Sequence, residues 1–236
     1  MKPRGNGRGR RLGLTRDKVI AAAVTMIERE GIDSFSLRRL ATELDVEAMS
    51  LYNHVSNRDA LLDGVAELLL AEVDFSGTDI GTWQDRVRAH AAAFRAAALR
   101  HPKAFPLVLT RPSKSPEALE TIHSALTCFD ELGLPPEELV HTLRSISAYI
   151  VGTIMRELGH SISLGTWDPS HAPRRIEELT ATGDPLLATV APYLAVGDHD
   201  IEYAYGIELL IAGIAARMGV PYDGGPRTAT RTSPAP

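Results

Sequence analysis

The sequence predicts an all-α protein in which a small helix-turn-helix head of three helices precedes a larger helical domain. Apolar residues recur every three or four positions through most of the 236 residues, which is the spacing of one helical face. No stretch alternates between apolar and polar residues as a half-buried strand does. Residues 37–62 hold two short helical patterns separated by a break, which is the arrangement of a helix-turn-helix unit.

The bulk composition is that of an ordinary globular protein, with 44% hydrophobic and 23% charged residues. A single cysteine, Cys128, excludes an internal disulfide and favours a reducing compartment. No segment approaches the roughly 20 apolar residues of a membrane span. The basic start "MKPRGNGRGRR" is not followed by the apolar run of a signal peptide. We therefore expect a cytoplasmic protein with no membrane partner.

Charge is distributed unevenly along the chain. Residues 1–60 carry a net charge of +3, whereas the remainder carries −8. A basic front on an acidic body suits a chain that touches a polyanion at one end. A basic tail without a partner is the alternative, and charge alone does not decide between the two.

Capping residues mark the helices of the head. Thr15 stands where an N-cap precedes a first helix, and Gly31 stands where that helix should end. Ser36 precedes a second apolar face, and a break leads to a short third helix that ends near His54 or Val55. These elements alone also fit a small helical bundle of another kind.

A fourth helix, near residues 58–72, follows the sequence "SNRD". Ser56 and Asp59 stand three apart, as the two residues of a capping box do. This helix is expected to join the head to the body.

After residue 74 the helical patterns become longer. One of them begins at "TWQDRV" and carries Trp83, Val87, Ala91, Phe94 and Ala98 along one stripe. A connector broken by prolines follows it, then helices near 117–131, 136–158 and 203–218, and residues 159–183 are interpreted mainly as a loop. The predicted parts are a basic disordered arm (1–14), the head (15–74), the larger domain (75–220) and a disordered tail (221–236).

Two of these helices, 136–158 and 203–218, have apolar faces wide enough to require burial. Their partner is either the rest of the same chain or a second copy of it. An isologous four-helix interface would bury such a pair in a twofold dimer. A twofold dimer is also what a palindromic DNA site requires.

The motifs of residues 15–65 resemble those of the TetR family of bacterial transcriptional regulators. They are "GIDSFS" before the second helix, "LYNHV" in the third and "NRDALLD" at the start of the fourth. The body resembles the tetracycline-repressor type of ligand domain through "TW", Phe94, "TRP" at 110–112 and "ISAYIVG" at 146–152. The resemblance covers roughly residues 15–218. It implies a homodimer with a DNA-reading head and a domain that binds an effector and dimerises.

Carried over position by position, the resemblance implies that one group of residues contacts DNA. These residues are Arg38, Ala48, Met49, Ser50, Tyr52, Asn53, His54 and Arg58. Arg38 is expected to reach a guanine edge or a phosphate, and Ser50 a base or a phosphate. Ala48 and Met49 offer apolar contact to a thymine methyl group. The other members are expected to contact the DNA backbone; the alternatives are that Tyr52 is partly a core residue and that His54 interacts with the dipole at the end of its helix.

The head departs from the tetracycline repressor at several of these positions. That repressor has Gln-Pro where this chain has Ala48 and Met49, Trp where it has Asn53, and Lys where it has Arg58. Loss of the Gln removes a side chain suited to reading adenine, so we expect a different operator. The basic arm before Thr15 either adds phosphate contacts or only increases solubility.

The resemblance also implies a set of effector-binding residues. They are His90, Phe94, Thr110, Arg111, Pro112, Ala125, Phe129, Val140 and Leu143. Phe94, Phe129 and Leu143 are equally well explained as core residues. His90 on an Ala-rich helix is the sharper signal, although a surface histidine or a hydrogen-bonded core histidine is the alternative.

Leu107 occupies the position where the resemblance places a magnesium-binding His. Leucine cannot ligate a metal, and tetracycline is bound at that position as a metal chelate. We therefore expect no metal, no cofactor and a more apolar organic effector.

The sequence thus predicts a regulator that binds a double-stranded DNA operator, a repressor that its effector releases. An activator, or a repressor of the same family that needs no effector, is the alternative. No enzyme is predicted, because the chain lacks a G-x-S-x-G elbow, a phosphate loop, an H-E-x-x-H pair and the Rossmann glycines. A helical scaffold that does not bind DNA fails to account for "LYNHV" and the basic front.

Overall fold

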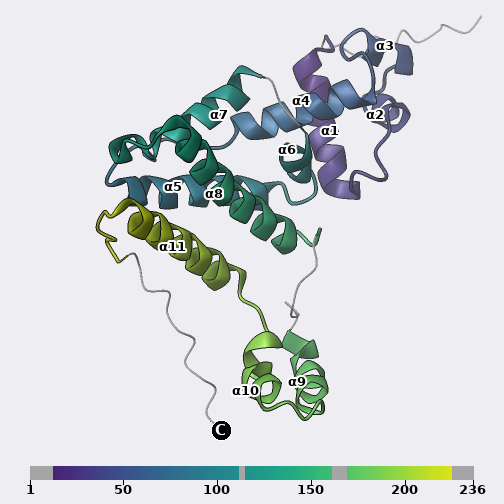
Figure 1. Cartoon of the computed structure of the whole chain (residues 1–236). Coiled ribbons are helices and arrows are strands. Elements are labelled where there is room, and N and C mark those ends of the chain that lie inside the picture. Colours follow the sequence, from purple (N-terminus) through teal and green to yellow (C-terminus); the bar gives the residue numbers. More distant parts are fainter. Residues whose placement is uncertain (1–12, 112–114, 161–168, 225–236) are drawn as a thin grey trace, which may run out of the picture. The chain divides into compact units, whose positions relative to one another are not determined.

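The computed structural model describes residues 13–111, 115–160 and 169–224. Within those ranges the regular elements are helices and none is a strand, which confirms the all-α prediction (Figure 1). No helix in the same ranges is long and apolar enough to cross a membrane. Most of the predicted arm and tail, and Pro112, lie outside the described residues.

The chain divides into two compact units. The first combines the residues up to Asp74 with Ala97–Glu120, and the second combines Phe75–Ala96 with the residues from Thr121 onward. One division between the units therefore follows Asp74. A second stretch, Ala97–Glu120, belongs with the head as well.

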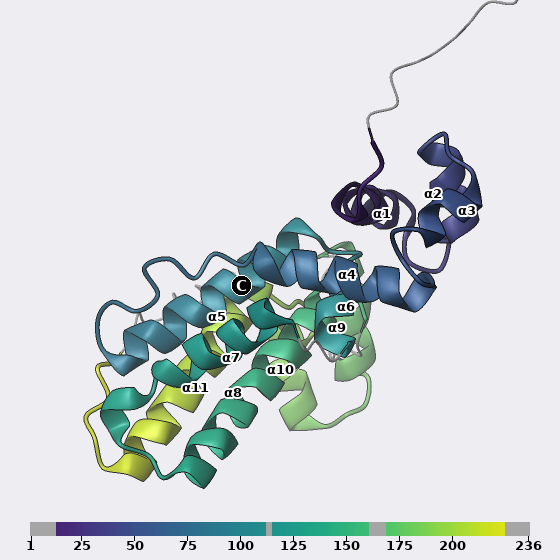
Figure 2. The same cartoon turned by 90° about the horizontal axis from the view of Figure 1, so that it is seen from above.

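The first unit contains the helices of the head and one short later helix (Figure 2). These are α1 (Arg16–Glu30), α2 (Leu37–Glu43), α3 (Ala48–Tyr52), α4 (Arg58–Ala71) and α6 (Pro106–Thr110). α2 packs on α3, and α4 packs on both α1 and α6. The buried side chains at their centre are apolar, and include Val19, Met26, Ile27, Leu40, Leu51, Leu61, Leu62, Val65 and Leu69.

Side chains cap the first helices as the sequence predicts. The hydroxyl of Thr15 accepts a hydrogen bond from the backbone N–H of Lys18 at 3.3 Å. The hydroxyl of Ser36 accepts one from the N–H of Arg39, also at 3.3 Å. Gly31 has a φ of 84° directly after α1, in a region that favours glycine. The predicted ends at these three positions are confirmed.

The N-cap of α4 is Asn57, so the prediction of Ser56 as its cap is wrong. The side-chain oxygen of Asn57 accepts a hydrogen bond from the N–H of Ala60 at 2.8 Å. Both serine and asparagine are good capping residues, and the extended backbone at Asn57 decides between them.

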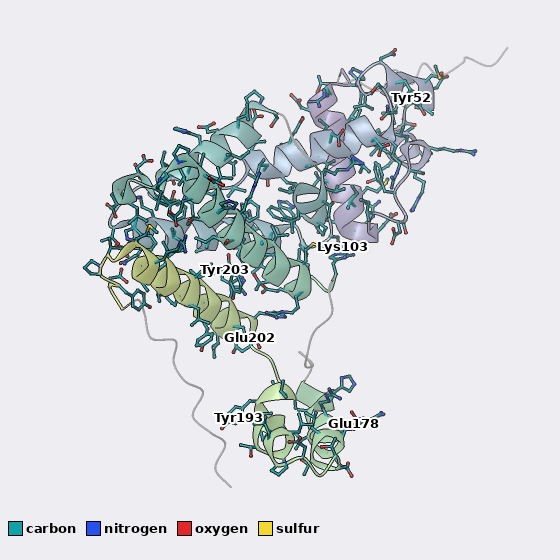
Figure 3. The ribbon with its side chains drawn as sticks, viewed as in Figure 1. Tyr52, Lys103, Glu178, Tyr193, Glu202 and Tyr203 are labelled. Atoms are coloured by element: carbon teal, nitrogen blue, oxygen red, sulfur yellow. The ribbon has the colours of Figure 1, made fainter. Side chains whose placement is uncertain are left out.

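Hydrogen bonds attach the later part of the first unit to α1. Glu28 accepts a hydrogen bond from the backbone N–H of Ala104 at 2.7 Å. The ammonium group of Lys103 donates one to the carbonyl of Arg29 at 3.0 Å (Figure 3). The loop that leads into α6 is therefore held by the last turn of α1.

The second unit is built on longer helices. They are α5 (Trp83–Arg100), α7 (Pro116–Thr127, shorter than the predicted 117–131), α8 (Pro136–Glu157) and α11 (His199–Met218). α5 and α7 contribute residues to both units. Arg95 on α5 binds Glu157 on α8 through two hydrogen bonds of 2.7 and 2.6 Å. Tyr149 on α8 donates a hydrogen bond of 2.7 Å to the carbonyl of Glu202 on α11.

Two further helices lie between α8 and α11 in the sequence, and the first of them falls in the stretch predicted mainly as a loop. They are α9 (Ala172–Thr180) and α10 (Pro185–Leu194), which pack on each other. The loop prediction for residues 159–183 is therefore wrong for α9. The prolines of this stretch favour a loop, but a proline in the first turn is also compatible with a helix. Asp184 caps α10 by accepting hydrogen bonds from two backbone N–H groups at 2.8 and 3.0 Å.

The corrected cap can be tested by comparing two neighbouring substitutions. Asn57→Ala should lower the free energy of unfolding by about 1 kcal/mol, because it removes the acceptor for the first turn of α4. Ser56→Ala should change it by less than about 0.5 kcal/mol, as for an ordinary surface position. Chemical denaturation of both variants measures the difference. An equal loss from both, or a larger loss from Ser56→Ala, would contradict the assignment of the cap.

Candidate functional site

The short helix α3 buries one side and exposes the other. Leu51 is fully buried and Val55, just after the helix, is nearly so. Met49 is 70% exposed and Tyr52 is 47% exposed (Figure 3). Because α3 ends at Tyr52, Asn53 and His54 lie in the turn after it rather than in the helix as predicted.

The predicted DNA-contacting residues of α2, α3 and this turn lie close together in the head. Arg38, Ala48 and Asn53 are exposed, and Ser50 and His54 are partly exposed. The next arginine, Arg39, is already engaged, because it donates a hydrogen bond of 2.7 Å to the carbonyl of Ser34 and pairs with Glu30. The guanidinium of Arg38 has no such partner among the described residues and is available to an outside group.

Arg58 has contacts of its own inside the head. Its guanidinium donates a hydrogen bond to the carbonyl of Ile32 at 3.3 Å. It also lies 5.9 Å from the centre of the Phe35 ring, within the range of a cation–π contact. Arg58 therefore fastens the start of α4 to the turn between α1 and α2, in addition to any contact with DNA.

The second unit contains a cavity of about 130 Å³ between α5, α7 and α8. Its lining is mainly apolar and aromatic, and in the described chain it includes no Asp, Glu, Lys or Arg. The lining residues are Phe75, Val87, His90, Ala91, Phe94, Thr121, Ala125, Cys128, Phe129, Leu143, Ile146, Ser147, Ile150 and Val151. Such a lining suits an uncharged organic ligand.

His90 is the most polar group of this cavity. Its ring stacks on Phe75, with 4.4 Å between the ring centres and 14° between the planes. Its Nδ1 lies 3.5 Å from the sulfur of Cys128. Its Nε2 is buried and has no hydrogen-bond partner among the described residues. Burial lowers the pKa of His90, so the imidazole is neutral at physiological pH.

The structure brings five of the predicted effector residues to the cavity. His90, Phe94, Ala125, Phe129 and Leu143 line it. Three others do not line it, namely Thr110, Arg111 and Val140, and Pro112 lies outside the described residues.

Thr110 and Arg111 have other partners in the first unit. The hydroxyl of Thr110 donates a hydrogen bond of 2.7 Å to the carbonyl of Pro106, one helical turn back. Arg111 forms ion pairs with Asp59 at 2.7 Å and with Asp63 at 2.5 Å, both on α4. Arg111 therefore connects the end of α6 to α4. Tertiary pairing of this kind cannot be read from position in the motif "TRP".

Comparison with known proteins agrees with both halves of this description. Residues 19–65 match the family "Bacterial regulatory proteins, tetR family", and residues 77–218 match "Tetracyclin repressor-like, C-terminal domain". The chain belongs to the TetR family. It is therefore a ligand-responsive, DNA-binding transcriptional regulator and not an enzyme.

Relatives cover nearly the whole chain. An HTH-type transcriptional regulator of Saccharopolyspora erythraea is 30% identical over 217 residues, which are 88% of this chain and 87% of the relative. The class D tetracycline repressor of Escherichia coli is 31% identical over 208 residues, covering 87% and 91%. The crystal structure of the Streptomyces coelicolor TetR family protein ActR with actinorhodin matches with a TM-score of 0.76 and 27% identity, covering 88% and 99%.

Leu107, where the resemblance places a metal-binding His, is buried on α6 of this TetR-family chain. Its side chain offers no ligand atom. Among the described residues, no group of three or more His, Cys, Asp and Glu could hold a metal ion.

Several residues that line the cavity of this TetR-family chain are not among the predicted effector-binding residues. Ala125, Cys128 and Phe129 are spaced by three and four, as on one helical face, so Cys128 could have been found from its neighbours. The lining of α8 shows the same spacing, from Leu143 to Val151. Phe75 lies in a loop before α5, and no local pattern marks it.

Cys128 allows a direct test of the cavity, because it is the single cysteine of the chain. Burial raises the pKa of its thiol from 9.0 to about 11. This rise alone lowers the reactive thiolate fraction about a hundredfold near neutral pH. A chromogenic thiol reagent should therefore label the native protein at least about a hundredfold more slowly than the denatured protein. Cys128→Ser provides the blank, and equally fast labelling of native and denatured protein would contradict the buried position.

Proposed function

We propose that this TetR-family protein is a cytoplasmic repressor that binds a palindromic operator as a homodimer. A small, apolar organic effector enters the cavity between α5, α7 and α8 without a metal and releases the DNA. The observation that carries the proposal is this cavity, because an apolar lining with a few polar groups is the usual form of a ligand site. The complex of ActR with actinorhodin supports a small-molecule effector here.

In this proposal the exposed residues of α2 and α3 read the operator. Arg38 binds a guanine edge or a phosphate, because its guanidinium is exposed and available. Ala48 and Met49 contact thymine methyl groups, and Ser50 contacts a base or phosphate. Tyr52, Asn53, His54 and Arg58 contact the DNA backbone, which positions the head without specifying sequence.

Exposed apolar surface on α8 and α11 supports the homodimer. Tyr205 and Leu209 on α11 are each 57% exposed, and Val140 on α8 is 38% exposed. The buried residues of α8 are few for so apolar a helix, namely Ile146, Thr153 and Ile154. A second copy that presents the same two helices would cover these faces with twofold symmetry.

Release requires that the effector bind one of two states more tightly than the other. α4 is the helix that transmits the change in this proposal. It carries Asp59 and Asp63, which pair with Arg111, and it joins the head to the larger domain. α5 and α7 contribute residues both to the cavity and to Ala97–Glu120 in the head's unit. A shift of these helices on ligand binding is therefore carried by the chain to α6 and α4.

Operator binding tests the role of the head. Selection of bound DNA from random sequences should return a palindrome. On that DNA, Arg38→Ala and Tyr52→Ala should each weaken binding about tenfold or more, because each removes a contact worth roughly 1–3 kcal/mol. A gel-shift titration at fixed salt measures the affinities. Affinity of the parent protein should also fall steeply as salt rises.

Two control substitutions show whether the loss of operator affinity is specific to Arg38 and Tyr52 or follows from removing any exposed arginine or tyrosine. Arg174→Ala on α9 removes an exposed arginine, and Tyr193→Ala on α10 removes a tyrosine that is 62% exposed. Both should leave operator affinity unchanged. Equal affinities for Arg38→Ala and Arg174→Ala would sink the assignment of Arg38 to DNA.

A screen of organic compounds tests the effector and the absence of a metal. A compound that fills the cavity should raise the Tm and weaken operator binding about 5–150-fold, the range of typical coupling energies. Tetracycline with Mg²⁺ should do neither, because Leu107 supplies no ligand. Thermal shift and fluorescence anisotropy of labelled operator measure the two effects. Strong stabilisation by tetracycline with Mg²⁺ would refute the metal-free effector.

A further inference from the structure

The geometry points to the chemical class of the effector, and this inference rests on the proposed function of the cavity. The part of the effector that enters is a single uncharged aromatic ring with a hydroxyl group, and that hydroxyl bonds to Nε2 of His90. Size, ring contacts, the unpartnered nitrogen and the charge of the lining each restrict the ligand in turn.

The size of the cavity fits one ring. Its volume is about 130 Å³, and a cavity of about 150 Å³ in another protein binds benzene. The walls include the stacked rings of Phe75 and His90 and, across the lining, those of Phe94 and Phe129. Aromatic side chains prefer offset-stacked or edge-to-face contacts with a further ring, so a planar ring suits this space better than a branched aliphatic group.

The unpartnered nitrogen of His90 calls for a polar group on that ring. A buried polar atom without a hydrogen bond is destabilising, and Nε2 is in that position. A core histidine with both nitrogens engaged would need nothing further. Within the described part of the chain, the only polar contact of the His90 ring is that of Nδ1 with the sulfur of Cys128 at 3.5 Å.

A hydroxyl group suits His90 in either of its neutral forms. A neutral imidazole carries one N–H and one lone pair, and the other nitrogen decides which of them Nε2 presents. The Cys128 thiol can donate to Nδ1 or accept from it, and it can instead donate to the carbonyl oxygen of Ser124, which lies 3.6 Å from its sulfur. A hydroxyl both donates and accepts, so it satisfies Nε2 in both arrangements, whereas a carbonyl satisfies only one.

The ring must also be uncharged. No Asp, Glu, Lys or Arg side chain lines the described cavity, and the neutral His90 offers a single hydrogen bond rather than a countercharge. A carboxylate would therefore be buried without a partner, which is strongly unfavourable.

A series of fluorinated probes tests this inference on the full-length protein. We would titrate para-fluorophenol, para-fluorotoluene and para-fluorobenzoate at about neutral pH and follow binding by fluorine NMR. The hydroxyl and methyl groups are similar in size, so they differ chiefly in hydrogen bonding. Para-fluorophenol should bind about tenfold more tightly than para-fluorotoluene, the effect of one good buried hydrogen bond. Para-fluorobenzoate should not bind measurably.

Substitution of His90 tests whether its Nε2 causes the preference for para-fluorophenol. His90→Phe keeps an aromatic ring against Phe75 and removes Nε2, so the ratio of the two affinities should fall to about one. His123→Phe is the matched control, because His123 is exposed on α7 and does not line the cavity; it should keep the tenfold preference. If His90→Phe does not fold, the probe series on the parent protein decides by itself.

Ala125→Leu, which fills the cavity, distinguishes this inference from the proposed site. One outcome is that the parent protein binds para-fluorophenol and para-fluorotoluene equally well, with the binding of both lost in Ala125→Leu. That result would overturn the inferred hydroxyl group but leave the cavity as the ligand site. Unchanged binding of the probes by a folded Ala125→Leu would overturn the site itself. Absence of any para-fluorophenol binding at millimolar concentration, or a preference retained in His90→Phe, would also overturn the inference.

Discussion

The first unit depends on the close packing of α4 against α1. A Cβ atom at Gly64 of α4 would stand 2.7 Å from the end of the Ile20 side chain on α1, so a larger residue would have to displace Ile20. On either side of Gly64, Leu61 and Val65 are fully buried. Apolar burial is the dominant stabilising term in folding. The exposed residues of α3 are therefore carried by a head in which α1 and α4 supply much of the buried apolar core.

The same helix α4 also packs on α6, and ion pairs add to this contact. Arg111 is largely buried, but its partners Asp59 and Asp63 are 76% and 52% exposed, and exposed ion pairs contribute about 0–1 kcal/mol. An allosteric coupling is itself typically about 1–3 kcal/mol. Ion pairs of this strength can exchange between two states without unfolding the first unit. The pairs of Arg111 are therefore contacts of α4 that a shift could exchange while the packing of α4 on α1 and α6 is kept.

Sequence patterns predicted most of the helices because apolar periodicity and capping are local. Thr15, Gly31 and Ser36 mark their ends correctly for that reason. Where two neighbours suit the same role, as Ser56 and Asn57 do, the backbone conformation decides, and the sequence does not reveal it. Five of the predicted effector residues meet at one cavity because they follow helical faces. Arg111 does not line that cavity, since its pairing with α4 depends on tertiary structure, and α9 was missed because its proline resembles a loop signal.

The size of the cavity links ligand binding to conformational change. Its volume of about 130 Å³ is below the roughly 300–1,000 Å³ of pockets that hold drug-sized ligands. An effector larger than one ring either extends through the open side of the cavity or displaces side chains of α5, α7 or α8. An effector that displaces side chains would bind the displaced state better than the state described here, which is the differential affinity that a population shift requires. The unpartnered nitrogen of His90 acts in the same direction, because a ligand that satisfies it stabilises only the state in which the ligand fits.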